Sequence, residues 1–316
     1  LNPATSYRVN VYAIDSARNQ TAYRVAEFRT PAAAGALTMA EYAGQCAKRL
    51  GRLKPMNCLD AEMIPITVGG KPIMPYLTAA EASNYRFGGP GDQQTCDKPA
   101  FLDLGVQGQC IPYSRVMRLD SYRPDGSKHS DVDSILVCRR YIARLGRQTW
   151  MGQSYDGSEF PGFEDVAIVQ HNRVTGETCW FQALAPLGES KDGRRVPPPD
   201  EAALPPGTPP YAETAETFWL SPPETGRRDC IKCHDSDAWM HSPYIDQVRH
   251  ADGTPIVFSG IKGGARTGRY STVGTRHFTE WTPPLSLVAK PAANGASCTS
   301  CHEVGDRESC ARWIAH

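Results

Sequence analysis

The sequence has no excess of charge of either sign and no long apolar run, and each absence excludes a class of protein. Its 316 residues carry 34 basic and 34 acidic side chains, so the formal net charge is zero. A balanced chain gives no indication of binding to nucleic acid or to an anionic membrane surface. No apolar run approaches the roughly 18 residues that a membrane-spanning helix needs. We therefore expect neither a nucleic-acid partner nor a membrane span.

Motifs for phosphate binding and for hydrolysis are absent as well. The sequence contains no G-x-G-x-x-G turn, no P-loop and no order of Ser, His and Asp typical of a catalytic triad. It does not begin with the segments of a signal peptide, so we expect that one was removed or that the sequence begins downstream of one. The residues left to carry chemistry are its 11 cysteines and 8 histidines.

Four of the cysteines form two C-x-x-C-H motifs, "CIKCH" at 230–234 and "CTSCH" at 298–302. Two thiols at this spacing can add to the two vinyl groups of a porphyrin, and the histidine that follows can reach the iron. A chain of this composition would contain roughly 0.01 such motifs by chance. The sequence therefore predicts two covalently bound haem c groups. Their attachment residues are Cys230, Cys233, Cys298 and Cys301, and their proximal iron ligands are His234 and His302.

Two other interpretations of these cysteine pairs are weaker. A thioredoxin-like pair needs a βαβ context, which "GRRDCIKCHD" lacks. A four-cysteine zinc site would leave the histidine after each pair as a coincidence. Over residues 230–234 and 298–302 the sequence resembles the multihaem c-type cytochromes. That resemblance implies a second axial ligand on each iron, usually histidine and otherwise methionine.

The candidates for this second ligand are, in order, His241, His277 and His250. His241 follows His234 by seven residues, which is about 10 Å along one side of a helix. Two ligands of one iron must instead face each other across it at about 4 Å. His241 is therefore expected to bind the haem on the second motif, or a haem of a neighbouring subunit.

Other residues of the C-terminal region have expected roles near the two haems. Pro243 is expected to end any helix near Ser242, which places His241 at the end of an element. His277 has enough chain to return to the first haem, and His250 is the reserve for either iron. Three tryptophans of the same region are candidates for shielding a porphyrin face or for ordinary core burial: Trp239, Trp281 and Trp313.

The other seven cysteines are widely spaced, which is typical of disulfides in an exported protein. An odd number leaves at least one outside any intrachain pair. Connectivity does not follow from sequence. Proximity along the chain favours Cys46 with Cys58 and Cys96 with Cys110, and Cys138 with Cys179 would join two strands. The alternative is that these cysteines are buried free thiols.

The first 30 residues are predicted to form two strands joined by the turn "DSARN". The spacing of Leu1, Pro3, Thr5 and Tyr7 resembles the last two strands of a fibronectin type III domain, which implies a tyrosine-corner role for Tyr7. Because two strands alone do not make a stable sandwich, we expect a fragment of a longer chain or a hairpin that completes another sheet.

The rest of the chain is expected to form a β-rich, disulfide-bonded domain (38–195), a proline-rich linker (196–217) and a loop-rich dihaem module with short helices (218–316). A helix should begin after the N-cap Thr38, with Glu41 completing a capping box and Gly51 near its end. "SILVCRRYIARL" and "EDVAIVQHN" are predicted strands. "HNRVTGETCWFQAL" is predicted to be a hairpin that turns at Thr-Gly.

These features predict an exported dihaem c-type cytochrome, extracellular or at the cell surface, else periplasmic, that transfers electrons. Its partners would be redox proteins or other haem subunits, and the low haem density favours a homo-oligomer or filament with haem-to-haem conduction. One alternative is a dihaem peroxidase-like enzyme with one open iron site. Another is a surface-binding protein with appended haems.

Overall fold

The computed structural model describes about three fifths of the chain. The described residues are 6–14, 20–29, 37–72, 97–98, 113–140, 161–186, 189–228, 230, 234, 238–258, 261–262, 265–266 and 270–274. Several predicted site residues lie outside them, so their predictions stay open: Cys96, Cys110, Cys233, His277, Cys298, Cys301 and His302.

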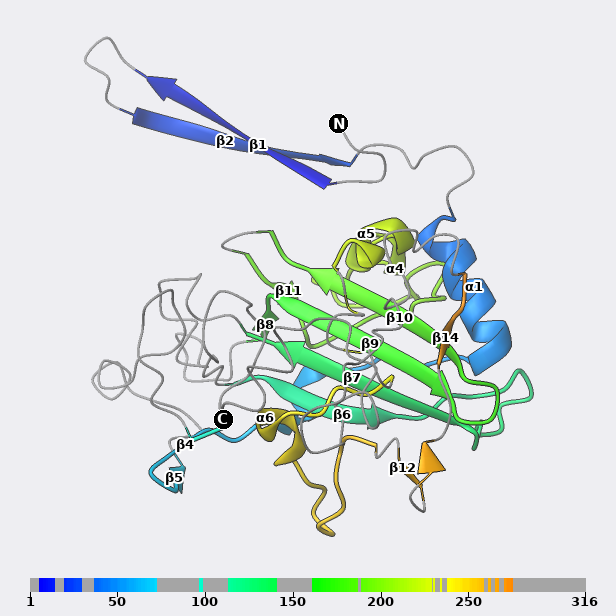
Figure 1. Cartoon of the computed structure of the whole chain (residues 1–316). Coiled ribbons are helices and arrows are strands. Elements are labelled where there is room, and N and C mark those ends of the chain that lie inside the picture. The colour runs from blue at the N-terminus through cyan, green and yellow to red at the C-terminus, as the bar shows by residue number, and fades with distance from the viewer. Residues whose placement is uncertain are drawn as a thin grey trace, which may run out of the picture.

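A six-stranded sheet forms the centre of the described structure, with the strand order β14-β10-β9-β7-β6-β3 (Figure 1). All neighbouring pairs are antiparallel except β10 and β14, which run parallel. The bounds are β3 Glu62–Met63, β6 Arg115–Leu119, β7 Val132–Arg139, β9 Asp165–Asn172, β10 Glu177–Leu184 and β14 Ser271–Thr272. The β-rich, disulfide-bonded character that the sequence predicts is therefore confirmed for this part of the chain.

Three small two-stranded sheets accompany the central one. They pair β4 (Thr67–Val68) with β5 (Lys71–Pro72), β8 (Gly162–Phe163) with β11 (Lys191–Asp192), and β12 (Ile261–Lys262) with β13 (Ala265–Arg266). The predicted hairpin is confirmed as β9 and β10, with Thr178 opposite His171. Its turn is held by Asn172, whose side-chain oxygen accepts hydrogen bonds from the N–H groups of Val174 and Thr175.

Helix α1 (Met39–Leu50) begins and ends where the sequence predicts. Thr38 and Glu41 form the complete capping box, so the first free N–H groups of the helix have partners. Gly51 ends the helix at φ +84°, and a Cβ there would lie 2.8 Å from the Tyr122 carbonyl oxygen. Glycine is required at this position for its backbone conformation and for the close approach of Tyr122.

The sheet separates two hydrophobic cores. Along β7 the side chains alternate, so that Leu136 and Cys138 join the core under α1 while Ile135 joins the core on the other face. The first core also receives the short helix α4 (Ala215–Phe218) and lies beside α5 (Pro222–Gly226); the second receives α6 (Pro243–Asp246). Figure 1 shows α1, α4 and α5 gathered together and α6 on the opposite side.

The disulfides join other cysteines than the sequence predicts: Cys46 with Cys179, and Cys58 with Cys138. The predicted pairs Cys46–Cys58 and Cys138–Cys179 are wrong. Cys138 and Cys179 lie on β7 and β10, which are separated by β9, so their backbones are too far apart for a bridge. Cys46 faces Cys179 because α1 packs across β10, a contact between segments 133 residues apart.

Two strands near the N-terminus, β1 (Ser6–Ile14) and β2 (Gln20–Arg29), form an antiparallel hairpin as predicted. Their register places Tyr7 opposite Phe28 and has a bulge at Ala13 and Ile14. The resemblance to a fibronectin type III domain is not tested by the hairpin alone and stays a prediction.

The proline-rich segment 196–217 packs on the sheet domain. Val196 exchanges two backbone hydrogen bonds with Met56, and the Trp219 indole donates to the carbonyl oxygen of Pro197 at 3.0 Å. The predicted domain boundaries stay a prediction, although this segment and the strand β14 both belong to the same packed body as β3 to β10.

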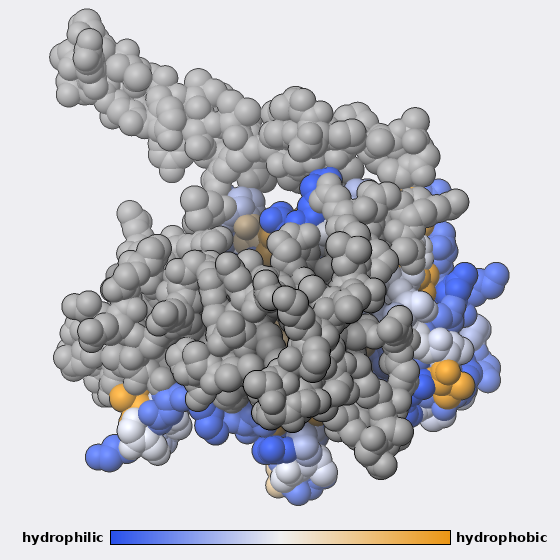
Figure 2. Space-filling model, viewed as in Figure 1, coloured by the Kyte–Doolittle hydropathy of each residue, from blue (hydrophilic) through white to orange (hydrophobic). Residues whose placement is uncertain are grey.

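The described residues that are visible in Figure 2 are mostly hydrophilic, with a few hydrophobic ones among them. Among the described residues the exposed large hydrophobic side chains are Val174 and Tyr211. No helix in the described part of the chain has both the length and the apolar character needed to cross a membrane.

Candidate functional site

Cys230 and His234, the first and last residues of the first C-x-x-C-H motif, lie near the outer edge of β10, with His234 against Trp180 of that strand. Beyond Thr178 this edge is no longer covered by β14, and the chain after α4 takes its place: the N–H of Leu220 donates to the Gln182 carbonyl oxygen at 2.8 Å. Helix α5 follows with its own capping box, formed by Ser221 and Glu224. The His234 N–H donates to the Cys230 carbonyl oxygen at 2.9 Å.

The His234 imidazole is held by a backbone carbonyl and by an aromatic ring. Its Nδ1 lies 2.9 Å from the carbonyl oxygen of Ala238, and its ring packs edge-on against Trp180 with 4.8 Å between centroids. Because a carbonyl can only accept, Nδ1 must carry the proton in this contact. Burial lowers the pKa of His234 to about 4, so the ring is neutral at neutral pH and its Nε2 is the basic nitrogen.

The backbone of His234 is held by Tyr270, the residue just before β14. The Tyr270 hydroxyl donates to the His234 carbonyl oxygen at 2.6 Å, and the Tyr270 ring packs against Trp180 at 5.4 Å. Tyr270 directly precedes β14, and the Trp180 indole contacts Thr272 on that strand at 3.3 Å. The parallel pairing of β10 with β14 therefore brings Trp180 and Tyr270 together around His234.

Cys230, at the start of the motif, lies near the buried hydroxyl of Tyr42. That hydroxyl accepts a hydrogen bond from the backbone N–H of Trp180 at 3.0 Å. Burial raises the pKa of Tyr42, and a negative charge on the Cys230 sulfur would raise it further. Cys230 packs against the core under α1 and belongs to neither disulfide. The motif thus begins at the core and ends at the Trp180 ring.

His241 lies in a different environment. Its Nδ1 is 2.9 Å from a carboxylate oxygen of Asp246, and both side chains are substantially exposed, at 44% and 40%. A positive charge on His241 lowers the pKa of His234, so the two rings are electrostatic neighbours. No helix runs through Ser242 among the described residues; Pro243 instead begins α6 with Ser242 as its N-cap, because proline fits the first turn. His241 still lies just outside an element.

The other described histidines have structural partners. His250 opens a turn in which its N–H donates to the Thr254 carbonyl oxygen at 2.9 Å, and its side chain is half-buried. His171 is buried, with Nδ1 2.8 Å from the Thr178 hydroxyl and its ring edge-on to Trp239. Trp239 is a core residue, packed against Phe258. The tryptophan beside His234 is Trp180, which sequence reasoning missed.

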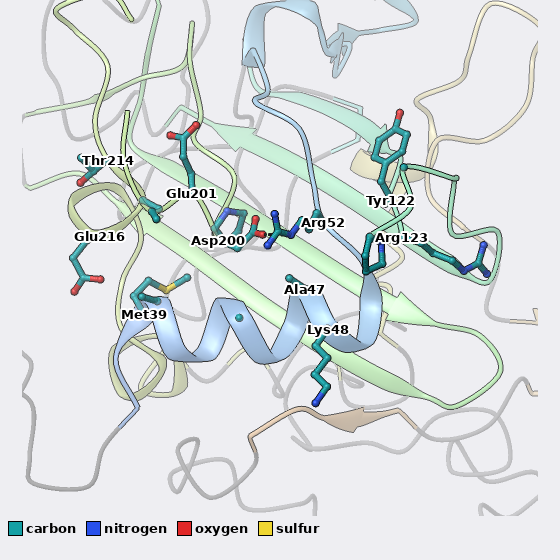
Figure 3. Close-up of a pocket in the computed structure, with 17 residues that line it drawn as sticks. Met39, Ala47, Lys48, Arg52, Tyr122, Arg123, Asp200, Glu201, Thr214 and Glu216 are labelled. Atoms are coloured by element: carbon teal, nitrogen blue, oxygen red, sulfur yellow. Dashed lines mark ion pairs between the residues drawn. The ribbon is translucent and has the colours of Figure 1, made fainter. Parts of the chain in front are cut away.

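A separate groove of about 820 Å³ runs along the outer side of α1. Figure 3 shows Arg52 and Asp200 pointing toward each other across it, with 3.2 Å between Nε and the carboxylate. Burial raises the pKa of Asp200. The lining combines small and apolar residues with charged residues of both signs, so it does not single out one class of ligand.

Within the described residues no three His, Cys, Asp or Glu side chains are grouped to hold a metal ion by themselves. A haem supplies four equatorial nitrogens of its own, so it needs only axial ligands and attachment points from the chain. Comparison with protein-family models, with curated proteins and with solved structures finds no match to this chain.

Proposed function

We propose that the protein is a dihaem c-type cytochrome that transfers electrons. The observation that carries the proposal is the second copy of C-x-x-C-H, together with the way in which His234 of the first copy is held. One motif alone would also fit a redox-active cysteine pair or half of a zinc site. Two motifs with histidine in the same place share one chemical requirement, which is covalent haem attachment with a proximal ligand.

The environment of His234 supports its role as a proximal ligand. Iron binds the neutral imidazole, and the nitrogen that binds is the one opposite the hydrogen-bonded Nδ1. The Ala238 carbonyl selects this tautomer, and burial keeps the ring neutral. The residues that would hold the first haem are Cys230 and Cys233 by thioether bonds and His234 by its Nε2. When bound, the haem supplies a one-electron iron couple.

Electron transfer is favoured over catalysis because the chain contains further histidines that could bind the second face of each haem iron. If each iron has ligands on both faces, no coordination position is open to a substrate. His241, His277 and His250 remain the candidates for the second faces, and the exposed position of His241 suits an iron that lies outside the packed body. That iron would belong to the haem on Cys298 and Cys301, or to a neighbouring copy of the chain.

The exposed position of His241 also supports an assembly of several copies of the chain. Two haems in 316 residues are few for long-range conduction within one chain, so current over longer distances would need other haem proteins or end-to-end contact between copies. Two disulfides favour an oxidising compartment, as expected of an exported protein. We propose an extracellular or periplasmic electron carrier that works with redox partners or in a filament.

The test is to produce the protein in a host with cytochrome c maturation and to measure haem content and spin state. Two covalent haems per chain, both low-spin in electron paramagnetic resonance (EPR), are the expected result. A chain without covalent haem would overturn the proposal. A high-spin signal in the unmutated protein, with carbon monoxide binding after reduction, would instead favour the peroxidase-like alternative.

A further inference from the structure

We propose that Asp246 is a positioning residue for His241: it makes Nε2 the iron-binding nitrogen and lowers the reduction potential of the haem that His241 ligates. The inference rests on the proposed function and adds a residue that no haem motif contains. Its basis is the contact between His241 Nδ1 and the Asp246 carboxylate at 2.9 Å.

The carboxylate is held on a rigid support. Asp246 is the last residue of α6, and its N–H donates to the Ser242 carbonyl oxygen at 2.9 Å. The two residues before it, Tyr244 and Ile245, are buried in the core on this face of the sheet at 5% and 7% exposure. A helical turn anchored in this way presents the carboxylate in one place, although the carboxylate itself is at the surface.

The contact decides which nitrogen can bind iron. An ionised carboxylate accepts only, so Nδ1 carries the proton and the lone pair is on Nε2. A carboxylate partner also makes the imidazole a stronger electron donor, as in carboxylate–histidine–metal triads. A stronger donor stabilises ferric iron relative to ferrous iron, and the reduction potential of that haem is lowered.

His234 provides the contrast within the same chain. Its Nδ1 donates to the neutral carbonyl oxygen of Ala238, which selects the same tautomer without adding charge. Of these two histidines, one is therefore backed by a neutral acceptor and the other by an anion. The two partners would separate the potentials of the haems that these histidines ligate.

The experiment compares the holoprotein with its Asp246→Asn, Asp246→Ala and His241→Ala variants by EPR and potentiometric titration. Asparagine keeps an acceptor oxygen but removes the charge, so both haems should stay low-spin while one potential rises. Alanine removes the acceptor, so one low-spin signal should also broaden or shift. His241→Ala should convert one haem to high-spin, and Asp246→Asn added to it should change nothing further.

The matched control is Asp252→Asn, which removes a carboxylate from an exposed turn on the same segment; the Asp252 carboxylate accepts hydrogen bonds from Thr254 within its turn. An equal rise in potential in Asp252→Asn and Asp246→Asn would show a through-space charge effect and overturn the inference. So would unchanged potentials in Asp246→Asn, or unchanged spectra in His241→Ala. In all three cases two low-spin haems in the unmutated protein would leave the proposed function standing, whereas absence of haem would remove both.

Discussion

His234 and His241 are the same residue type on one short segment, yet they lie in different environments. His234 is half-buried against Trp180 and Tyr270, and its Nδ1 donates to a neutral carbonyl. His241 is exposed, and its Nδ1 contacts a carboxylate. The chemistry of a histidine is therefore set by what its second nitrogen contacts and by how much water reaches it.

In the proposed cytochrome, His234 would serve both haem attachment and iron ligation, whereas His241 would serve iron ligation alone. His234 belongs to a motif whose spacing alone predicts its role, and the fold then supports it from β10 and β14. His241 belongs to no motif, and its candidacy depends on Asp246 and on exposure. Four perturbations test this distinction.

The largest effect is expected from His234→Ala measured beside His241→Ala. Loss of the proximal ligand should lower the covalent haem content toward one per chain, because attachment at Cys230 and Cys233 needs the histidine that orients the iron. His241→Ala should keep two haems per chain and change only the spin state of one. The pyridine haemochrome assay counts the haems. Equal haem loss in the two variants would contradict the distinction.

The next effect comes from the disulfide that holds β10 against α1. Removing it with Cys46→Ala and Cys179→Ala should lower the free energy of unfolding by about 2–5 kcal/mol. Chemical denaturation followed by circular dichroism measures this change. Because Cys179 precedes Trp180, the near-ultraviolet signal of the site around His234 should change as well.

Cys58→Ala with Cys138→Ala is the control for that experiment. The two disulfides close loops of 133 and 80 residues. The entropic stabilisation expected from these two loop lengths differs by only about 0.5 kcal/mol. The control pair should destabilise the protein to a comparable extent while leaving the EPR signal of the first haem in place. Loss of that signal in the control alone would contradict a local role for the Cys46–Cys179 bond.

A third effect is a pH dependence confined to the chain without haem. The pKa of His234 is near 6.5 when unfolded and about 4 when folded, so the unfolded state binds the extra proton between these values. Stability should therefore be complete above pH 6.5 and decrease as the pH falls toward 4, by up to about 3 kcal/mol. Urea titrations at several pH values of a chain expressed without haem attachment would measure this.

The sign of this effect follows from the depressed pKa, since protonation favours the unfolded state. His234→Gln should remove most of the dependence. A flat stability profile in the parent chain between pH 4 and 6.5 would contradict the burial of His234.

The smallest effect is expected from Tyr270→Phe. The variant keeps the ring against Trp180 and removes only the hydroxyl that donates to the His234 carbonyl oxygen. A loss of about 0.5–1.5 kcal/mol in unfolding free energy is expected. Val174→Ala, in an exposed turn, is a neutral reference. A change in the reduction potential of the haem that His241 ligates, with no change in that of the first haem, would contradict the role of Tyr270 beside His234.

Local elements were predictable because their causes are local. Thr38, Glu41 and Gly51 define α1 through caps that involve residues three or four positions apart. The hairpin of β9 and β10 follows from the alternation of its strands and from the glycine in its turn. The two C-x-x-C-H motifs are likewise visible as a short fixed spacing in the sequence.

Contacts between distant segments were not predictable in this way. The disulfide pairing depends on α1 crossing β10, and the order of strands separates Cys138 from Cys179. The groups that contact Nδ1 of His234 and of His241 could not be identified from the sequence either. The acceptor for His234 is a backbone carbonyl, which every residue has, and Asp246 is one of many acidic residues.

The α1 helix, the strands β1, β2, β7, β9 and β10, the β9–β10 turn and the two C-x-x-C-H motifs can be read from the amino-acid order, because each depends on residues a few positions apart. The meeting of Trp180 and Tyr270 around His234, and the bond between Cys46 and Cys179, depend instead on tertiary packing. Those contacts exist because a parallel strand from a distant part of the chain pairs with the edge of β10, and a helix from another part packs across its face and buries its apolar side chains.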